Sequence, residues 1–316
     1  MSAEVGRGDV VEAAAQIEGL VEHTPLIESE VDGTPVWLKC ECLQTGGAFK
    51  LRGATNRLLQ LSAAERERGV VAFSSGNHAR GVAIAARRLG IRATIVMPSD
   101  APRVKVDGTR SEGAEIIFYD RRTERREAIA ARISEETGAV VVPSFDDPAI
   151  VAGQGTAGLE IVQQLGRAPR RIIVPCGGGG LASGIALAVP QAEIVIVEPE
   201  GWDDMARSLE VGEIVPVAAD APDTRLDALQ TPKVSPITFG ILREREATAL
   251  WVSDEEAFDA VRFAWKRHQL VVEPGGAAAL AALLSGKVAP LDDTVVVLSG
   301  GNIDPALHAL IVGGDA

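Results

Sequence analysis

The sequence is short of several features, and each shortage excludes a class of protein. It has three cysteines, Cys40, Cys42 and Cys176, which is an odd number without CxxC spacing, so we expect no disulfide framework. Lys and Arg number 31 against 44 Asp and Glu, which gives a net charge of −13. That charge argues against nucleic acid or an anionic membrane surface as a partner.

Long hydrophobic runs are also missing. Apolar stretches such as residues 182–189 are much shorter than a bilayer span, and the first ten residues lack the basic and apolar regions of a signal peptide. The hydrophobic share of 46% over 316 residues still allows a sizeable core, in one large domain or two linked lobes. We therefore expect a soluble, cytoplasmic protein that crosses no membrane.

Short β-branched runs alternate with longer segments rich in Ala and Leu. Several of the runs are apolar throughout, as in strands of a parallel sheet covered on both faces. The pattern predicts an α/β fold with mainly parallel, twisted sheets flanked by helices. Only residues 201–242 are irregular, and we expect a long surface connection there. The strands are expected at 70–73, 93–97, 115–119, 139–142, 171–175, 194–197 and 294–298, and the helices at 79–89, 122–136, 155–165, 181–188, 255–268 and 277–284.

The chain has 33 glycines, and they cluster. Four in a row, Gly177, Gly178, Gly179 and Gly180, lie between a predicted strand and a predicted helix. Their backbone can approach a ligand closely, and successive N–H groups at a helix N-terminus attract an anion. No Gly-Lys-Ser/Thr follows, which excludes a P-loop and leaves a phosphate group as the natural ligand. A plain strand-to-helix turn would need only one or two glycines.

The same cluster also fits a dinucleotide-binding pattern. Gly177, Gly179 and Ala182 satisfy G-x-G-x-x-G/A, and Glu198 stands at the end of the next predicted strand, where a ribose-binding acid would lie. Taken alone, this segment makes an NAD-dependent oxidoreductase a serious alternative.

Three further turns bear on the choice. Lys50 follows a glycine-rich turn at a predicted helix start, where the positive field lowers the pKa of an amine and suits it to react with a carbonyl. Residues 74–78 bring hydroxyls and an amide to another helix start, either as an anion site or as an ordinary helix cap. Residues 299–302 end a further strand. Because carboxyl ends of parallel strands meet at one edge of a sheet, we expect these turns to line one crevice.

Together these motifs resemble the fold-type II family of pyridoxal-phosphate enzymes, specifically its threonine/serine dehydratase and serine racemase branch. The resemblance covers almost the whole chain, from residues 17–26 and 38–54 through 152–156 and 271–275 to 299–302. The dinucleotide alternative explains only one of these motifs.

The resemblance implies a two-lobed fold like that of the tryptophan synthase β subunit. Residues 1–68 and 148–316 would form the large cofactor-binding domain, and residues 69–147 the small substrate-loop domain. A homodimer is expected by the same resemblance.

It also implies roles for single residues. Lys50 would bind pyridoxal 5′-phosphate covalently and later remove the substrate Cα proton. Asn77 would donate a hydrogen bond to the ring's 3′ oxygen, and Ser299 would face the ring nitrogen. The other cofactor contacts would be Phe49, Gly177, Gly178, Gly179, Gly180 and Leu181, and the substrate contacts Ser74, Ser75, Gly76, Asn77, His78 and Arg126.

A hydroxyl at Ser299 favours elimination chemistry. A serine cannot keep the ring nitrogen protonated as a carboxylate does, so the ring is a weaker electron sink and prompt loss of a β-leaving group is favoured over transamination. We expect an ammonia-lyase that converts L-threonine or L-serine to a 2-oxo acid and ammonia.

Other activities stay open at this point. Arg126 or Lys233 could receive a second carboxylate, as a 3-hydroxyaspartate dehydratase requires, and hydroxyectoine-catabolic proteins also look similar. In serine racemases, a hydroxyl at the position of Ser75 would protonate the opposite face of Cα. Without a modified Lys50, the chain would be a binding or regulatory protein.

The segment 198–204 resembles the family's divalent-cation site. Its ligands would be Glu198, the backbone carbonyl of Trp202 and Asp204, with waters, and such all-oxygen ligation suits Mg²⁺ or Ca²⁺. Trp202 stands where the family usually has a small residue. An acidic surface loop is the alternative interpretation.

Overall fold

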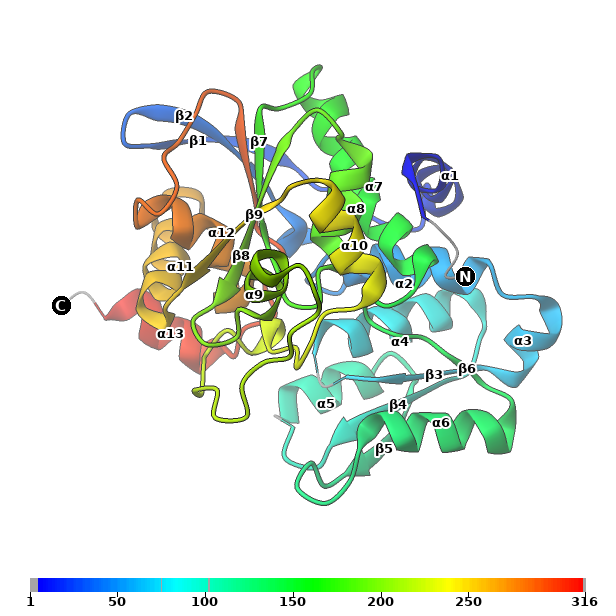
Figure 1. Ribbon diagram of the computed structural model, residues 1–316. Coiled ribbons are helices and arrows are strands. Elements are labelled where there is room, and N and C mark those ends of the chain that lie inside the picture. The colour runs from blue at the N-terminus through cyan, green and yellow to red at the C-terminus, as the bar shows by residue number, and fades with distance from the viewer. Residues whose placement is uncertain (1–4, 75, 102, 315–316) are drawn as a thin grey trace.

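Two β-sheets organise the computed structural model, which describes residues 5–74, 76–101 and 103–314 (Figure 1). The larger sheet has the strand order β1-β2-β10-β7-β8-β9, and the smaller one β5-β4-β3-β6. Every neighbouring pair is parallel except β1 and β2, which form a hairpin. The strands are β1 (Leu26–Val31), β2 (Thr34–Lys39), β3 (Val70–Phe73), β4 (Ala93–Pro98), β5 (Glu115–Tyr119), β6 (Val140–Val141), β7 (Arg171–Pro175), β8 (Glu193–Pro199), β9 (Thr248–Val252) and β10 (Thr294–Val297).

Helices cover both sheets, and a series of them connects the two (Figure 1). From the smaller sheet, α4 packs on α2, α2 on α7, and α7 on α8, which contacts the larger sheet. The helices are α1 (Arg7–Ile17), α2 (Lys50–Leu59), α3 (Ala63–Arg68), α4 (Asn77–Leu89), α5 (Arg103–Arg110), α6 (Arg126–Thr137), α7 (Pro148–Leu165), α8 (Gly180–Ala188), α9 (Asp204–Val211), α10 (Pro236–Glu244), α11 (Asp254–His268), α12 (Pro274–Leu284) and α13 (Pro305–Gly313), with short 3₁₀ turns η1 (Glu41–Leu43) and η2 (Asp227–Leu229).

The larger sheet is buried on both faces. Ile173 and Val195 pack into one apolar cluster with residues of α11 and α12. Their neighbours Ile172 and Ile194 point the opposite way, into a second cluster with α7 and α8. Successive side chains of a strand alternate between faces, so uninterrupted apolar runs are what two covered faces require. The predicted α/β fold with mainly parallel sheets is confirmed.

The prediction of an irregular connection at residues 201–242 holds for residues 212–235, apart from η2, and was wrong at the two ends of the segment. The segment contains α9 and η2 and the start of α10. Pro236 occupies the first turn of α10, and the Ser235 hydroxyl caps that helix by accepting the Thr238 N–H. Proline is well tolerated at this position because its missing N–H would have no partner in the helix.

The strands of the smaller sheet all lie between Val70 and Val141, and those of the larger sheet flank this segment in sequence. An inserted small lobe would have this arrangement, and the domain bounds given above stay a prediction. In the described part of the chain, no helix is both long and apolar enough to cross a bilayer.

Candidate active site

Lys50 is the first residue of α2, and its amine is held in a half-buried position. The amine donates a hydrogen bond to the Ser144 carbonyl at 3.1 Å and lies 5.0 Å from the centre of the Phe49 ring. Burial disfavours the charged form and lowers the pKa of Lys50 to about 8. About a tenth of the amine is therefore unprotonated at pH 7, far more than for an ordinary lysine, and this is the form that a nucleophile or general base requires.

The four glycines form the connection between β7 and α8. Gly179 has φ +83° and is the N-cap of α8, so the turn delivers its N–H groups to a helix N-terminus. A Cβ on Gly178 would lie 2.2 Å from the Phe145 ring, and one on Gly180 would lie 3.0 Å from the Phe145 Cβ. Phe145 follows Ser144, whose carbonyl accepts a hydrogen bond from the Lys50 amine. The segment Ser144–Phe145 therefore contacts both the lysine and the glycine turn.

Asn77 begins α4 and belongs to a chain of hydrogen bonds. Its amide nitrogen donates to the Glu273 carboxylate at 2.5 Å, and its amide oxygen accepts from Asn302 at 2.7 Å. Asn302 also donates to the Gly46 carbonyl at 2.7 Å and accepts from Arg80 at 3.0 Å. Because the Gly46 carbonyl can only accept, the orientation of both amides is fixed. Among the described residues, the second N–H of Asn77 has no partner, so it could serve a ligand.

Ser299 follows β10 and lies beside the lysine segment. Its carbonyl accepts the Phe49 N–H at 3.2 Å, and an isolated β-bridge joins Ala48 to Gly300. A Cβ on Gly300 would lie 2.2 Å from the Glu273 carboxylate and 3.0 Å from the Asn77 amide nitrogen. The structure thus brings the segments of Lys50, Asn77 and Ser299 together, although they are far apart in sequence.

Glu273 and Asn302 are the residues of this site to which sequence reasoning gave no role. Glu273 is buried, and burial raises its pKa to about 7 against the opposing effect of the Asn77 hydrogen bond. Both residues lay inside motifs that carried the resemblance. Only the fold shows that they bond to Asn77.

Other predicted substrate residues differ in their placement. Ser75 lies outside the described residues. The Ser74 hydroxyl accepts the Gly76 N–H at 3.1 Å. His78 is buried with Nε2 2.9 Å from the Val142 carbonyl, and burial together with the Lys50 charge lowers its pKa to about 3. A histidine that stays neutral in this way is a poor proton donor.

The remaining predicted residues lie on other elements. Leu181 is buried in α8 within the core on one face of the larger sheet. Arg126 lies 5.6 Å above the Phe73 ring, at the end of β3, and pairs with Glu127 at 2.9 Å. Lys233 is exposed.

The predicted cation site combines the end of β8 with the start of α9. The Glu198 carboxylate accepts N–H groups of Met205 and Ala206 at 2.9 and 2.8 Å, and burial together with the Asp204 charge raises its pKa. Burial raises the pKa of Asp204 to about 7, and its Oδ2 is buried without a hydrogen-bond partner among the described residues. The indole of Trp202 donates to the Pro222 carbonyl at 2.8 Å. Two buried acids would supply only part of the oxygen ligands that a hard cation such as Mg²⁺ requires, and no group of three or more His, Cys, Asp or Glu suited to a metal ion occurs among the described residues.

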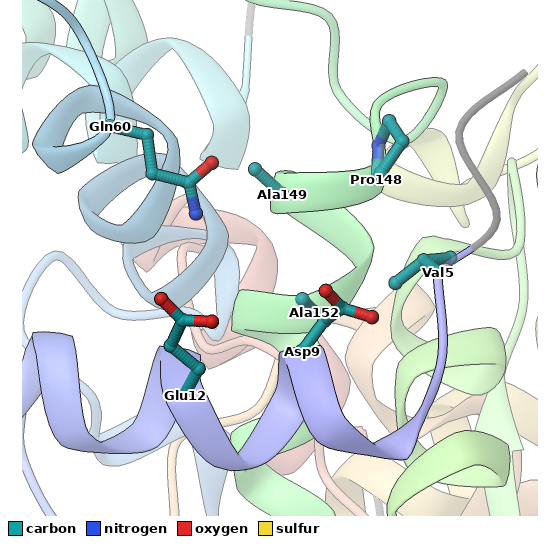
Figure 2. Close-up of a pocket in the computed structure, with 7 residues that line it drawn as sticks. All are labelled: Val5, Asp9, Glu12, Gln60, Pro148, Ala149 and Ala152. Atoms are coloured by element: carbon teal, nitrogen blue, oxygen red, sulfur yellow. The ribbon is translucent and has the colours of Figure 1, made fainter.

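Two hollows in the described part of the chain differ in their relation to these residues. One opens beside Asn77, between α4, α5 and the 301–305 segment, and Arg80 and Lys105 give it basic walls. The other lies between α1, α2 and α7, and none of its residues is a predicted site residue (Figure 2). It is lined by Val5, Asp9, Glu12, Gln60, Pro148, Ala149 and Ala152. The first hollow therefore adjoins the candidate site.

Residues 17–300 match the family described as pyridoxal-phosphate dependent enzymes. The chain belongs to this family. An L-threo-3-hydroxyaspartate ammonia-lyase from Pseudomonas sp is 44% identical to it, over 97% of this chain and 98% of the relative. A serine racemase from Schizosaccharomyces pombe is 42% identical over 95% of each chain. The solved structure of maize serine racemase superposes with a TM-score of 0.91 at 36% identity, over 96% of this chain and 95% of that one.

Membership of the pyridoxal-phosphate family decides between the two cofactors considered. The fold is the fold-type II arrangement, and the NAD-dependent alternative is overturned. The residues also fit pyridoxal phosphate, because the glycine turn leaves no room for side chains, the Lys50 amine has a lowered pKa, and one N–H of Asn77 has no partner among the residues that the structure describes.

Proposed function

We propose that this enzyme converts a β-hydroxy amino acid to a 2-oxo acid and ammonia by α,β-elimination, with L-threonine and L-serine as its first candidate substrates. The observation that carries the proposal is the Lys50 amine, whose pKa is lowered to about 8 and which hydrogen-bonds to the residue beside the glycine turn. When bound, the cofactor supplies an electron-accepting ring that weakens the substrate Cα–H bond.

Each protein group has a defined task in this proposal. The N–H groups of the turn from Gly177 to Gly180 would bind the cofactor phosphate, and the free N–H of Asn77 its ring oxygen. The start of α4 at Gly76 would bind the substrate carboxylate. The unprotonated Lys50 amine would accept the Cα proton.

The proposed reaction needs no oxidant or reductant, because it consists of the loss of one water and the addition of another. The Cα proton and the Cβ hydroxide leave the substrate as water, which gives an enamine. The enamine tautomerises to an imine, and one water hydrolyses the imine to the 2-oxo acid and ammonia. Threonine would give 2-oxobutyrate and serine would give pyruvate.

A second candidate substrate is L-threo-3-hydroxyaspartate. The name of the Pseudomonas relative favours it, and so does Arg126, whose guanidinium lies over Phe73, one residue before Ser74. A guanidinium binds a carboxylate in a planar, bidentate way, which suits the side chain of a dicarboxylic substrate. Lys233 is a weaker choice because it is exposed. The Schizosaccharomyces pombe relative makes serine racemisation a third activity to test.

One assay separates these activities. Release of 2-oxo acid and ammonia is measured from L-threonine, L-serine, D-serine and both 3-hydroxyaspartate diastereomers, and D-serine formed from L-serine is measured in parallel. We expect elimination from at least one L-substrate and none in Lys50→Ala. No 2-oxo acid from any of them, in protein that shows the visible absorbance of bound cofactor, would refute the proposed reaction.

We also propose that the enzyme is a cytoplasmic homodimer with Mg²⁺ or Ca²⁺ at Glu198 and Asp204. The two buried acids and the resemblance to the family's cation segment support the metal. The dimer is supported by the family resemblance, and light scattering of the purified protein tests it.

A further inference from the structure

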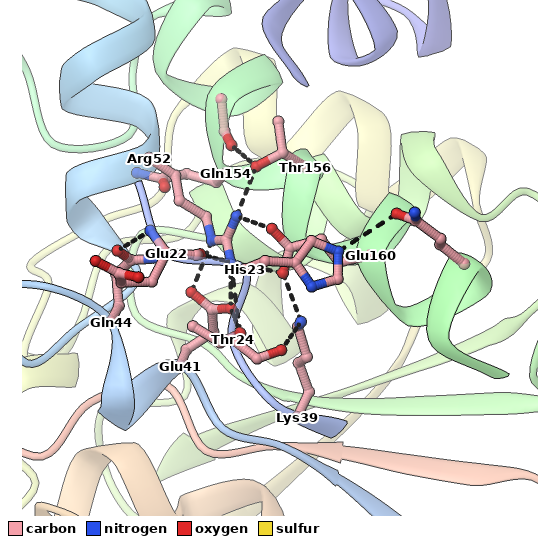
Figure 3. Close-up of polar contacts among 12 residues, drawn as sticks. Glu22, His23, Thr24, Lys39, Glu41, Gln44, Arg52, Gln154, Thr156 and Glu160 are labelled. Carbon is pink, nitrogen blue, oxygen red and sulfur yellow. Dashed lines mark hydrogen bonds and ion pairs between the residues drawn. The ribbon is translucent and has the colours of Figure 1, made fainter. Parts of the chain in front are cut away.

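Arg52 lies in the first turn of α2, two residues after Lys50, and its side chain is completely buried. Figure 3 shows it at the centre of a polar cluster. Its guanidinium donates twice to Glu41, at 2.8 Å each, and twice to Glu160, at 2.5 and 2.8 Å. It also donates to the Thr156 hydroxyl at 3.2 Å. One side chain therefore joins α2 to η1 and to α7.

The cluster is electrically balanced. Lys39 adds a second cation and donates to Glu160 at 2.6 Å and to the Thr24 carbonyl at 2.8 Å. Burial acts to raise the pKa of Glu41, but the charge and hydrogen bonds of Arg52 hold it below its ordinary value. Two cations thus face two carboxylates, and removing one partner would leave a buried charge uncompensated.

Arg52 and Lys50 point in nearly opposite directions from the same helical turn. Helix geometry rotates successive residues by about 100°, so these two side chains lie about 200° apart. On one side, a Cβ on Gly153 of α7 would lie 2.6 Å from the Gly53 Cα. On the other, a Cβ on Gly81 of α4 would lie 3.1 Å from the Lys50 carbonyl carbon. The start of α2 is held closely between two helices, and any rotation about its axis would move the amine.

We propose that Arg52 is a positioning residue for Lys50. Its planar guanidinium, with paired hydrogen bonds to Glu41 and Glu160, fixes how far the first turn of α2 lies from η1 and α7 and how it is rotated. Paired parallel hydrogen bonds define an orientation, whereas a single point charge does not. We call this paired arrangement the fork of Arg52. The Lys50 amine is thereby directed to the Ser144 carbonyl and the glycine turn. This proposal rests on the catalytic role of Lys50 proposed above.

The test compares Arg52→Lys with Arg57→Lys. The first keeps the charge and loses the fork. The second is a matched control on the same helix, because Arg57 donates to Asp147 at 2.8 Å and is partly exposed. In cofactor-free protein, the rate at which acetic anhydride acetylates Lys50 is followed across pH by mass spectrometry. In the holoenzyme, kcat and KM are measured.

We expect Arg52→Lys to shift the pH midpoint of Lys50 acetylation and to lower kcat about tenfold or more, with KM changed much less, since small displacements of a reacting group cost large factors in rate. Arg57→Lys should leave both unchanged. A folded Arg52→Lys protein with the wild-type Lys50 midpoint and kcat would overturn the proposal, whatever its thermal stability.

Two more variants keep the test decisive. If Arg52→Lys does not fold, Thr156→Val removes a single acceptor of the fork, and the same shift and loss are expected on a smaller scale; an unchanged midpoint and kcat there would also overturn the proposal. Lys50→Ala separates the two claims. If Lys50→Ala keeps catalysis, the role proposed for Lys50 fails and the role of Arg52 fails with it. If catalysis is lost in Lys50→Ala but not in the Arg52 and Thr156 variants, only the role of Arg52 is refuted.

Discussion

At the scale of single residues, burial sets the chemistry of the site. It lowers the pKa of Lys50 to about 8 and, together with the Lys50 charge, that of His78 to about 3, and it raises the pKa of Glu273 to about 7. All three changes disfavour a charged form in a poorly hydrated environment. The site therefore holds an amine that can act as a base, a neutral imidazole and an acid that titrates near neutrality.

Glu273 makes stability depend on pH. Its pKa is about 7 in the folded protein and near 4.5 when unfolded, so between these values the folded state holds a proton that the unfolded state has lost. Stability from this group is therefore highest below about pH 4.5 and declines as pH rises to about 7. The loss is at most about 3 kcal/mol.

We expect Glu273→Gln to remove this pH dependence while keeping an acceptor for the Asn77 amide. Urea unfolding of the cofactor-free protein at pH 5.5 and pH 8 gives the comparison. From pH 5.5 to pH 8, the free energy of unfolding of the variant should fall less than that of the wild type. Parallel pH dependence of both proteins would show that Glu273 does not titrate in this range.

At the scale of elements, the glycine turn must have a glycine at position 178 because the Phe145 ring fills the space that a side chain would need. Because a Cβ on Gly178 would lie 2.2 Å from that ring, Gly178→Ala must displace Phe145 and with it the segment that also contacts Lys50. We expect a stability loss of about 1–3 kcal/mol and a cofactor affinity at least about tenfold weaker.

The control for this variant is Gly240→Ala in α10, where a Cβ would meet nothing within 4 Å. This change should raise stability by about 0.5–1 kcal/mol, since alanine favours a helix interior over glycine. Urea unfolding measures stability, and absorbance titration of the cofactor-free protein measures affinity. Wild-type affinity in Gly178→Ala would count against the glycine turn as the phosphate site.

The junction of β8 and α9 carries the metal prediction. One oxygen of the Asp204 carboxyl has no partner among the described residues, and the Asp204 charge acts on the buried Glu198. A divalent cation should therefore stabilise the ionised form of both acids. Added Mg²⁺ or Ca²⁺ should stabilise the wild type, by about 4 kcal/mol at a concentration a thousand times Kd. Asp204→Asn should abolish the effect, and Asp203→Asn, whose carboxyl pairs with Arg207 at 3.6 Å, should retain it. Thermal midpoints unmoved by either cation after chelation would refute the site.

Local sequence signals predicted the elements unevenly. The β-branched runs of β3, β5 and β7 were predicted with their observed bounds. The β1–β2 hairpin was missed, although Asp32 and Gly33 at its turn have φ of +50° and +75°, which is the geometry that an Asp-Gly pair favours. The helix predicted at 155–165 begins earlier, at Pro148 of α7. The side chain of Asp147 caps it there by accepting two helix N–H groups, a signal that the prediction did not use.

At the scale of the whole molecule, the sequence predicted turns but not their partners. The glycine turn and Lys50 could be predicted because each depends on a local backbone signal. The bond from Asn77 to Glu273 and the fork of Arg52 on Glu160 join segments that only the folded chain brings together. No periodicity or spacing in the sequence encodes such contacts.

Lys105 and Asp227 form an ion pair across the molecule. Lys105 lies on α5, beside the smaller sheet, and lines the hollow that adjoins Asn77; Asp227 lies on η2, in the segment that follows β8. Since half of the Asp227 side chain is exposed, the pair should contribute less than about 1 kcal/mol to stability. Its larger effect should be on substrate binding, because closing the two parts over the site excludes water.

We expect Lys105→Met and Asp227→Asn each to raise KM several-fold with little change in thermal stability, and the double variant to raise it no further than the stronger single one. Such non-additivity is the signature of two groups that act as a pair. Rising salt should raise KM in the wild type and have less effect in the variants, because ions screen an exposed pair. Independent, multiplying effects of the two substitutions would instead mean that each residue contacts the substrate or its path separately.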